Sequence, residues 1–150
     1  MPSNGGGYPG QPCKGPLKPE FQYYPQGITF YNYKSRGNQY FPAQLPPING
    51  PAVLEISDQY CRVSQYEVRI KGQSLGWTSN TQFDRRCHVF YNSYCRYNMD
   101  DCIRKGFSHG FFQIPSGSHN VQIVWVNGDF QGWTHNEGLY RVYEPCPGQY

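Results

Sequence analysis

The stretch GFSHGFFQIPSGSHNVQIVWV, residues 106–126, decides the fold class of this chain. Phe112 and Ile114 alternate with a polar residue before the segment Pro-Ser-Gly-Ser at 115–118, and apolar residues recur with a period of two over 121–125. Such alternation is typical of half-buried β-strands, and a short Gly-containing segment between two of them predicts a hairpin. The stretch also holds several serines and two histidines, so a catalytic role has to be considered beside the structural one.

Four further segments carry strand patterns. They are ITFYNY (28–33), AVLEISD (52–58), QYEVRIKGQSLG (65–76), which turns at Lys71-Gly72-Gln73, and LYRVYEP (139–145). About seven or eight short strands with turn signals between them predict an antiparallel, all-β sandwich. We expect this domain to span residues 28–145.

Low-complexity segments flank the predicted domain. Residues 1–27 are rich in Gly, Pro, Gln and Tyr, a composition that by itself favours an irregular, disordered tail. Residues 146–150 form a short C-terminal tail. The chain starts MPSNGGGYPGQPCKGP without an apolar core segment, so no secretion signal is expected.

Composition argues against two classes of partner. The formal net charge is +3, and the basic residues are scattered rather than gathered into a patch, so we expect no nucleic-acid binding. No apolar run approaches the roughly 18 residues that span a bilayer, so we expect no membrane insertion. The 14 Tyr, 9 Phe and 3 Trp instead favour contacts with other surfaces.

Six cysteines favour disulfides and therefore an oxidising compartment, such as a vacuole or the cell exterior, although the absence of a secretion signal argues the other way. The loop over 77–106 contains three of them, which suggests that it is stapled. We assign Cys61, Cys87, Cys95 and Cys102 as intramolecular candidates. Cys13 and Cys146 lie near the chain ends, where they either bridge between molecules or clip the two termini together. We carry them forward as candidates for an intermolecular disulfide.

Ser108 and His109 are adjacent on a predicted strand, so their side chains point to opposite faces and do not form a nucleophile–base pair. His119 lies across the predicted turn, but no strand–turn–helix elbow surrounds Ser108. We therefore predict no catalytic residues here, and expect these side chains to bond the backbone or neighbouring strands.

A metal site is not expected either. Cys87-His88, Cys95 and Cys102 lack the paired spacing of structural zinc sites, and Asp100-Asp101 lacks the pattern of a calcium loop. The two aspartates are expected to cap a turn or face solvent. We predict no metal and no cofactor.

The aromatic residues allow two kinds of surface. We expect Trp125 and Trp77 in the core, and Trp133, Tyr8 and Tyr150 exposed as contact residues. Exposed rings suit either other protein surfaces or sugars. A glycan-binding site that includes Trp133 is the alternative.

Two runs carry a resemblance to known proteins: LEISDQYCRVSQYEVRIKGQSLGWTS, and much later GFSHGFFQIPSGSHNVQI. They resemble secreted bacterial and fungal domains of uncharacterised function, over about residues 50–126. The resemblance brings no catalytic residue set. It implies that the recurring polar positions, Asp58, Thr78, Ser108, His109 and His119, lie at turns and strand ends. Within that group, the chain is similar to a crystal-forming protein of zygomycete fungal vacuoles, whose crystals sediment in gravity sensing.

We therefore expect a non-catalytic structural protein whose partner is itself. A disulfide-stapled sandwich would supply the shape, and aromatic and Gly/Pro-rich ends would supply weak contacts between copies. A carbohydrate-binding module is the alternative, and an enzyme ranks third because no constellation of titratable residues is visible in the sequence.

Overall fold

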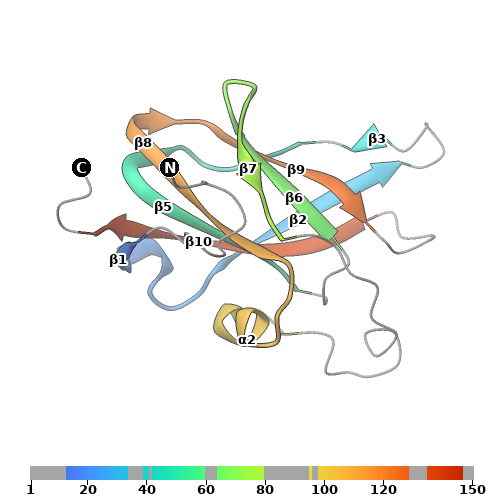
Figure 1. Ribbon diagram of the computed structural model, residues 1–150, viewed down its shortest axis with the longest axis horizontal. Coiled ribbons are helices and arrows are strands. Elements are labelled where there is room, and N and C mark those ends of the chain that lie inside the picture. Colours follow the sequence, from blue (N-terminus) through green and yellow to red (C-terminus); the bar gives the residue numbers. More distant parts are fainter. Residues whose placement is uncertain are drawn as a thin grey trace.

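The computed structural model describes residues 13–33, 39–40, 42–59, 64–79, 95, 98–128 and 135–146. Within these residues the chain forms strands, one 3-10 helix and one α-helix (Figure 1). In chain order they are β1 (Lys14–Leu17), η1 (Pro19–Phe21), β2 (Gln26–Tyr33), β3 (Gln39–Tyr40), β4 (Ala43–Gln44), β5 (Ile48–Asp58), β6 (Ser64–Ile70), β7 (Gln73–Trp77), α2 (Met99–Arg104), β8 (His109–His119), β9 (Val121–Gly128) and β10 (His135–Pro145).

The strands form two antiparallel sheets, which confirms the predicted all-β sandwich. One sheet has the order β3-β2-β10-β5-β8, with β1 also paired to β10, and the other has the order β4-β9-β6-β7. In Figure 1 the β6–β7 hairpin stands over the larger sheet, and α2 lies beside the start of β8. The described residues hold more strands than the seven or eight expected. The strands that the sequence did not predict are β1, β3 and β4, which have only two to four residues each. Strands this short leave no period in the sequence.

The hairpin of β6 and β7 confirms the pattern over 65–76. Ile70 pairs with Gln73, so the turn consists of Lys71 and Gly72 alone. Both have positive φ, 52° and 79°, which is the geometry of the tight turn that matches strand twist. Gln73, expected in the turn, already belongs to β7.

The hairpin predicted from 106–126 is wrong. The segment 115–118 is part of β8, and the chain reverses at Asn120 instead. β8 pairs with β5 in one sheet, whereas β9 pairs with β6 and β4 in the other. The turn signals mislead because β8 is an edge strand. Pro115 lies where the β5–β8 register shifts, and Gly117 takes φ 102° within the strand.

Gly50 marks the closest approach of β5 and β8. A Cβ atom on Gly50 would lie 1.8 Å from the carbonyl oxygen of Pro115, so the two backbones would have to separate. We expect Gly50→Ala to lower the free energy of unfolding by at least about 1–3 kcal/mol, the usual cost of overpacking. Urea denaturation measures it. Asn49→Ala, on the exposed neighbour, should change stability by less than about 0.5 kcal/mol; equal effects of the two changes would contradict the close approach.

The main core lies between the sheets. Even-numbered residues of β5, β8 and β10 point inward, among them Leu54, Phe112 and Val142, and they meet Tyr66, Val68, Ile123 and Trp125 of the smaller sheet. The odd-numbered residues point to the outer face of the larger sheet. Two smaller clusters lie there, one that includes Leu17 of β1 and one that includes residues of α2: Leu17, Val53, Phe111 and Tyr143 in the first, and Cys95, Met99, Cys102, Ile103, Phe107 and Leu139 in the second.

Part of the predicted tail joins this fold. β1 pairs with the end of β10, at Lys14↔Pro145 and Leu17↔Tyr143. The ring of Phe21 in η1 meets that of Tyr140 edge-on, with centroids 5.5 Å apart. Among residues 1–27, therefore, 13–27 belong to the domain, and the boundary expected at residue 27 does not follow a break in the structure.

Two disulfides are present among the described residues. Cys95 bonds Cys102, as expected for an intramolecular pair. Cys13 bonds Cys146 within the same chain, so the intermolecular assignment is corrected: pairing β1 with β10 brings the two chain ends together. Cys61 and Cys87 lie outside the described residues. The bonds indicate an oxidising compartment or the cell exterior.

Candidate functional site

The recurring polar positions lie at strand ends. Asp58 ends β5, Thr78 follows β7, Ser108 precedes β8, and His109 and His119 are the first and last residues of β8. The hydroxyl oxygen of Thr78 accepts a hydrogen bond from the Tyr66 backbone N–H at 2.9 Å, and the Asp58 N–H donates to the Ser108 carbonyl at 2.7 Å. These contacts supply hydrogen bonds where the strand ladders end.

Ser79 connects the two sheets at this end of the sandwich. Its backbone N–H donates to the carbonyl of His109 at 3.0 Å, and its hydroxyl oxygen accepts from the His109 N–H at 3.1 Å. Because Ser79 follows β7 and His109 begins β8, this pair of bonds joins an edge strand of one sheet to an edge strand of the other.

Ser108 and His109 are not arranged as nucleophile and base. The Ser108 hydroxyl is fully buried and has no hydrogen-bond partner among the described residues, so it makes no hydrogen bond to the His109 ring. Nδ1 of His109 lies 2.6 Å from the Phe107 carbonyl, and Nε2 of His119 lies 2.9 Å from the Ser116 carbonyl. Both rings bond backbone, as expected from the sequence.

A charged cluster that the sequence did not predict lies on the outer face of the larger sheet. Glu55 of β5 is fully buried and sits opposite Arg141 of β10. Its Oε1 accepts hydrogen bonds from Arg141 Nε at 2.5 Å and from the Tyr143 hydroxyl at 2.8 Å. The guanidinium also donates to Asp100 of α2 at 2.6 Å. The cluster thereby ties α2 to the middle of the sheet.

Lys14 closes the cluster from β1. Its Nζ lies 3.7 Å from Glu55 Oε2 and 4.4 Å from the ring centroids of both Phe111 and Tyr143. An ammonium over two ring faces gains from their negative potential. The charges of Lys14 and Arg141 balance those of Glu55 and Asp100, so the cluster is electrically neutral. It links β1 and α2 to the middle of the larger sheet.

Tyr143 contributes stability that is lost at alkaline pH. Burial raises the pKa of its hydroxyl well above the ordinary value of 10.0, and the Glu55 carboxylate raises it further. The folded chain therefore keeps a proton that the unfolded chain releases near pH 10, so this contribution is complete below pH 10 and declines above it. We expect Tyr143→Phe to flatten the fall of unfolding free energy above pH 10, measured by urea denaturation. Tyr23→Phe, at an exposed site, should leave the profile unchanged; matching profiles for all three proteins would contradict this assignment.

Asp100 and Asp101 both lie in the first turn of α2. The side chain of Asn98 caps the helix by accepting from the Asp101 N–H at 3.1 Å, and Asp101 pairs with Arg104 and Lys105. The hydrogen bond from Arg141 holds the pKa of Asp100 below its usual range. Among the described residues, no group of His, Cys, Asp or Glu side chains is placed to hold a metal ion.

Large aromatic side chains are exposed in two places. Tyr23 and Tyr24, between η1 and β2, are 87% and 73% exposed, and Trp77 at the end of β7 is 53% exposed. Trp125 is buried, as expected, but the prediction of a buried Trp77 is wrong: Trp77 pairs with Glu67 on the outer face of the smaller sheet. Trp133, Tyr8 and Tyr150 lie outside the described residues.

Glu67 lies opposite Trp77 in the β6–β7 pair. Burial raises the pKa of this carboxyl group, but hydrogen bonds from Trp77, Ser74 and Arg69 outweigh burial and hold it below its usual range. The Trp77 ring itself stays in contact with solvent.

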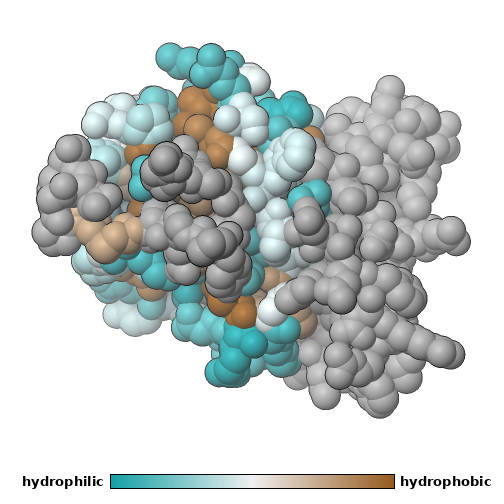
Figure 2. All heavy atoms as spheres, viewed as in Figure 1, coloured by the Kyte–Doolittle hydropathy of each residue, from teal (hydrophilic) through white to brown (hydrophobic). Residues whose placement is uncertain are grey.

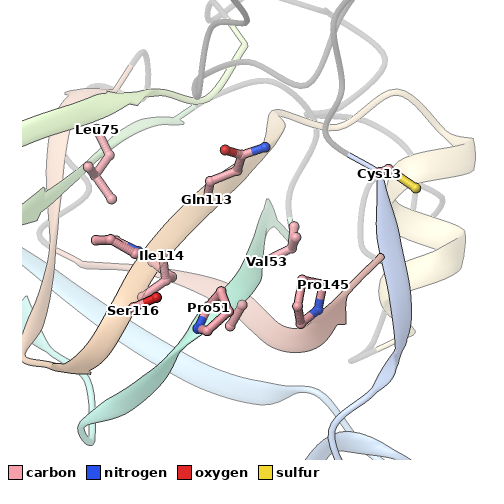
Figure 3. A pocket seen from close by; sticks show the side chains of 10 residues that line it. Cys13, Pro51, Val53, Leu75, Gln113, Ile114, Ser116 and Pro145 are labelled. Carbon is pink, nitrogen blue, oxygen red and sulfur yellow. The ribbon is translucent and has the colours of Figure 1, made fainter. Parts of the chain in front are cut away.

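Two clefts open on the described surface. The first, about 330 Å³, is lined by Pro51, Val53, Leu75, Gln113, Ile114 and Pro145, with Cys13 at its far end. Figure 3 shows the Gln113 side chain rising from β8 between Leu75 and Val53. No ionisable side chain belongs to the described lining, whose polar side chains are Gln113 and Ser116, so this cleft offers an amide and a hydroxyl rather than an acid–base pair.

The second cleft, here called the Phe21 cleft, lies between η1, the β4–β5 connection and β10. It measures about 370 Å³. Its walls are apolar and mostly rings: Phe21, Pro46, Pro47, Ile48, Tyr140 and Val142. Glu20, Gln26 and Asn49 are exposed at its lip, and the Lys18 ammonium donates to the Asn49 carbonyl at 2.9 Å.

Other parts of the described surface carry small, separated apolar areas. In the view of Figure 2, brown residues surface in several places among hydrophilic ones. No α-helix in the described part of the chain has the length and apolar character needed to cross a membrane. No protein-family model, curated protein or solved structure matches the chain.

Proposed function

We propose that this protein is a non-catalytic structural protein that assembles with copies of itself into dense crystals. The observation that carries the proposal is the exposure of large aromatic rings at two separate places on one sandwich, Tyr23–Tyr24 beside β2 and Trp77 on β7. Two different contact surfaces on one body favour head-to-tail contacts, which propagate when they do not close into a ring.

The covalent and ionic links within one chain support the same function. Cys13–Cys146 joins the two chain ends, and the Glu55 cluster balances its charges internally. A body held in this way loses little conformational entropy when it packs into a lattice. Disulfides would thus stabilise the crystal from inside each copy.

The setting of the proposed crystals comes from sequence resemblance. We propose that the chain resembles OCTIN, the octahedral-crystal protein of zygomycete vacuoles, whose crystals act as sedimenting particles in gravity sensing. On that resemblance we propose a vacuolar location and the same role for this chain. The disulfides support an oxidising compartment, of which a vacuole is one.

Sedimentation of the oxidised full chain over a concentration series tests self-assembly. We expect reversible association that Tyr23→Ser with Tyr24→Ser and Trp77→Ser weakens at least tenfold, because buried aromatic anchors dominate most interfaces. Gln22→Ser with Gln73→Ser, at exposed neighbouring positions, is the matched control. A wild-type chain that stays monomeric at every soluble concentration would refute the proposal.

A carbohydrate-binding module is a second candidate. Tyr23 and Tyr24 lie beside the Phe21 cleft in sequence, and exposed rings next to amide and carboxylate groups suit sugar recognition. Titration calorimetry with soluble oligosaccharides would show saturable heat, lost in Tyr23→Ser with Tyr24→Ser. No heat from any sugar would leave self-assembly as the only candidate.

A further inference from the structure

β1 occupies a site that the larger sheet builds at the end of β10 (Figure 1). The two strands pair at Lys14↔Pro145 and Leu17↔Tyr143, and a Cβ atom on Gly15 would lie only 2.8 Å from the Pro145 carbonyl oxygen. Because β5 pairs with the other side of β10, β1 and β2 share the remaining side, one after the other. The structure therefore shows what fills this site, a four-residue strand from the start of the described chain.

The side chains of β1 cover part of the outer face of that sheet. Leu17 packs against the apolar cluster that includes Val53 and Phe111, and the Lys14 ammonium lies 3.7 Å from Oε2 of the buried Glu55. That oxygen has no hydrogen-bond partner among the described residues. Without β1, the cluster, this carboxylate and one edge of β10 would lose their cover. An empty site is costly, so a site that its own β1 has left favours another strand of the same sequence.

The contacts of β1 belong to a segment that can move as one unit. We call residues 13–22 the N-terminal arm; its described hydrogen bonds, ion pair, ring contacts and disulfide to the rest of the chain all reach residues 49–146. Tyr23 and Tyr24 join the arm to β2. They are 87% and 73% exposed, and no backbone hydrogen bond ties either one to another described element. A change of backbone direction at residues 23–25 would therefore move the whole arm.

The Cys13–Cys146 disulfide joins the arm covalently to the residue that follows its own β10. Cys13 is exposed, whereas Cys95 and Cys102 of the other described disulfide are both buried. A dithiol reductant therefore reaches the arm bond more readily. Its thiolate attacks Sγ of Cys13, the Cys146 thiolate leaves, and the second thiol of the reductant then releases Cys13. The protein gains two electrons and two protons, and the reductant becomes a disulfide.

We propose that the Cys13–Cys146 bond prevents the N-terminal arm from exchanging between copies of this chain, and that its reduction allows the exchange. In the oxidised chain the arm stays on its own β10. After reduction, the arm of a second copy takes the same site with the same strand pairing and the same ion pair. Each lost contact is replaced by an identical one, so the exchange is a low-cost route to a dimer, and its yield rises with protein concentration. It concerns the reduced chain and goes beyond the proposed crystals of oxidised copies.

Two variants that each lack one cysteine test the exchange. Cys146→Ser keeps Cys13, and Cys13→Ser keeps Cys146, so neither chain can close this bond by itself. After mixing at high concentration and air oxidation, we expect a 1:1 disulfide-linked heterodimer on a non-reducing gel, with its bond between residues 13 and 146 located by mass spectrometry. Either variant alone should give at least tenfold less covalent dimer, because the exchange brings no two identical cysteines together. A mixture without heterodimer would overturn the proposal.

Leu17→Asp distinguishes exchange of the arm from random collision of thiols. On the chain that keeps Cys13, it should lower the heterodimer yield at least tenfold, because an aspartate cannot pack against Val53 and Phe111. On the chain that keeps Cys146, the same substitution lies in an arm that has to leave its site, so the yield should not fall. Equal yields with the substitution on either chain would show that the thiols meet by collision.

Isotope labelling of the wild type tests the role of the disulfide. Labelled and unlabelled chains are mixed with or without dithiothreitol, which is then removed to allow reoxidation. A labelled Cys13 peptide bonded to an unlabelled Cys146 peptide is expected only after reduction. Hybrid bonds at equal yield without the reductant would show that the disulfide does not prevent exchange. These outcomes leave the proposed crystals untouched, because the sedimentation series on the oxidised chain tests them separately.

Discussion

Replacing Glu55 with glutamine is expected to lower the free energy of unfolding by about 3–5 kcal/mol, the usual loss when one partner of a buried ion pair is removed. The Glu55 side chain is fully buried, and its Oε1 is 2.5 Å from Arg141 Nε. Glutamine keeps the shape but leaves the buried guanidinium without its nearest countercharge. Against a typical stability of about 5–15 kcal/mol, this is a large loss.

Urea denaturation measures the change, and a double substitution keeps the test decisive if Glu55→Gln fails to fold. Glu55→Leu with Arg141→Met removes both charges and should recover most of the lost stability, because an apolar pair of similar volume often replaces a buried ion pair at little cost. Glu20→Gln, at an exposed carboxylate, is the matched control. A Glu55→Gln chain as stable as the control would show that the cluster does not hold β10 to β5.

Removal of the Cys13–Cys146 disulfide should cost far more than removal of Cys95–Cys102. The two bonds close loops that differ in sequence separation, 133 against 7 residues. In the chain-entropy model these loops correspond to about 5 and about 2.4 kcal/mol. We therefore expect the Cys13→Ala, Cys146→Ala protein to unfold at a clearly lower urea concentration than the Cys95→Ala, Cys102→Ala protein.

The two bonds fasten different elements of the fold. Cys13–Cys146 fixes β1 against β10, so its removal also frees Lys14 from the Glu55 cluster, whereas Cys95–Cys102 holds only α2 and its entry. Equal urea midpoints for the two double alanine variants, or a lower midpoint for the Cys95→Ala, Cys102→Ala protein, would contradict the inference that Cys13–Cys146 fixes β1 against β10.

The sequence predicts those parts of the fold that depend on local pattern. The strand segments read at 52–58 and 65–70 correspond to β5 and β6, and Lys71-Gly72 corresponds to the tight turn. The pattern over 106–126 identifies two strands but assigns them to one hairpin, because Pro115 and Gly117 carry turn chemistry inside an edge strand.

The remaining features depend on contacts between distant segments. Glu55 and Arg141 are 86 residues apart, and nothing near either one marks a buried carboxylate or guanidinium. Trp77 follows an alternating strand, so its pattern favours the core, but a register shift in β7 turns its side chain outward. The Phe21 cleft likewise combines η1, the β4–β5 connection and β10, which only the pairing of the chain ends brings together.

The central claim is that copies assemble without disulfide bonds between them. Its most direct test combines sedimentation with denaturation. Wild-type assemblies collected at high protein concentration should dissolve in denaturant without a reducing agent and give one species of 17.3 kDa. That result would show that copies associate without covalent links, each with its own Cys13–Cys146 bond. A ladder of covalent multimers that collapses only on reduction, or the absence of any assembly, would contradict it.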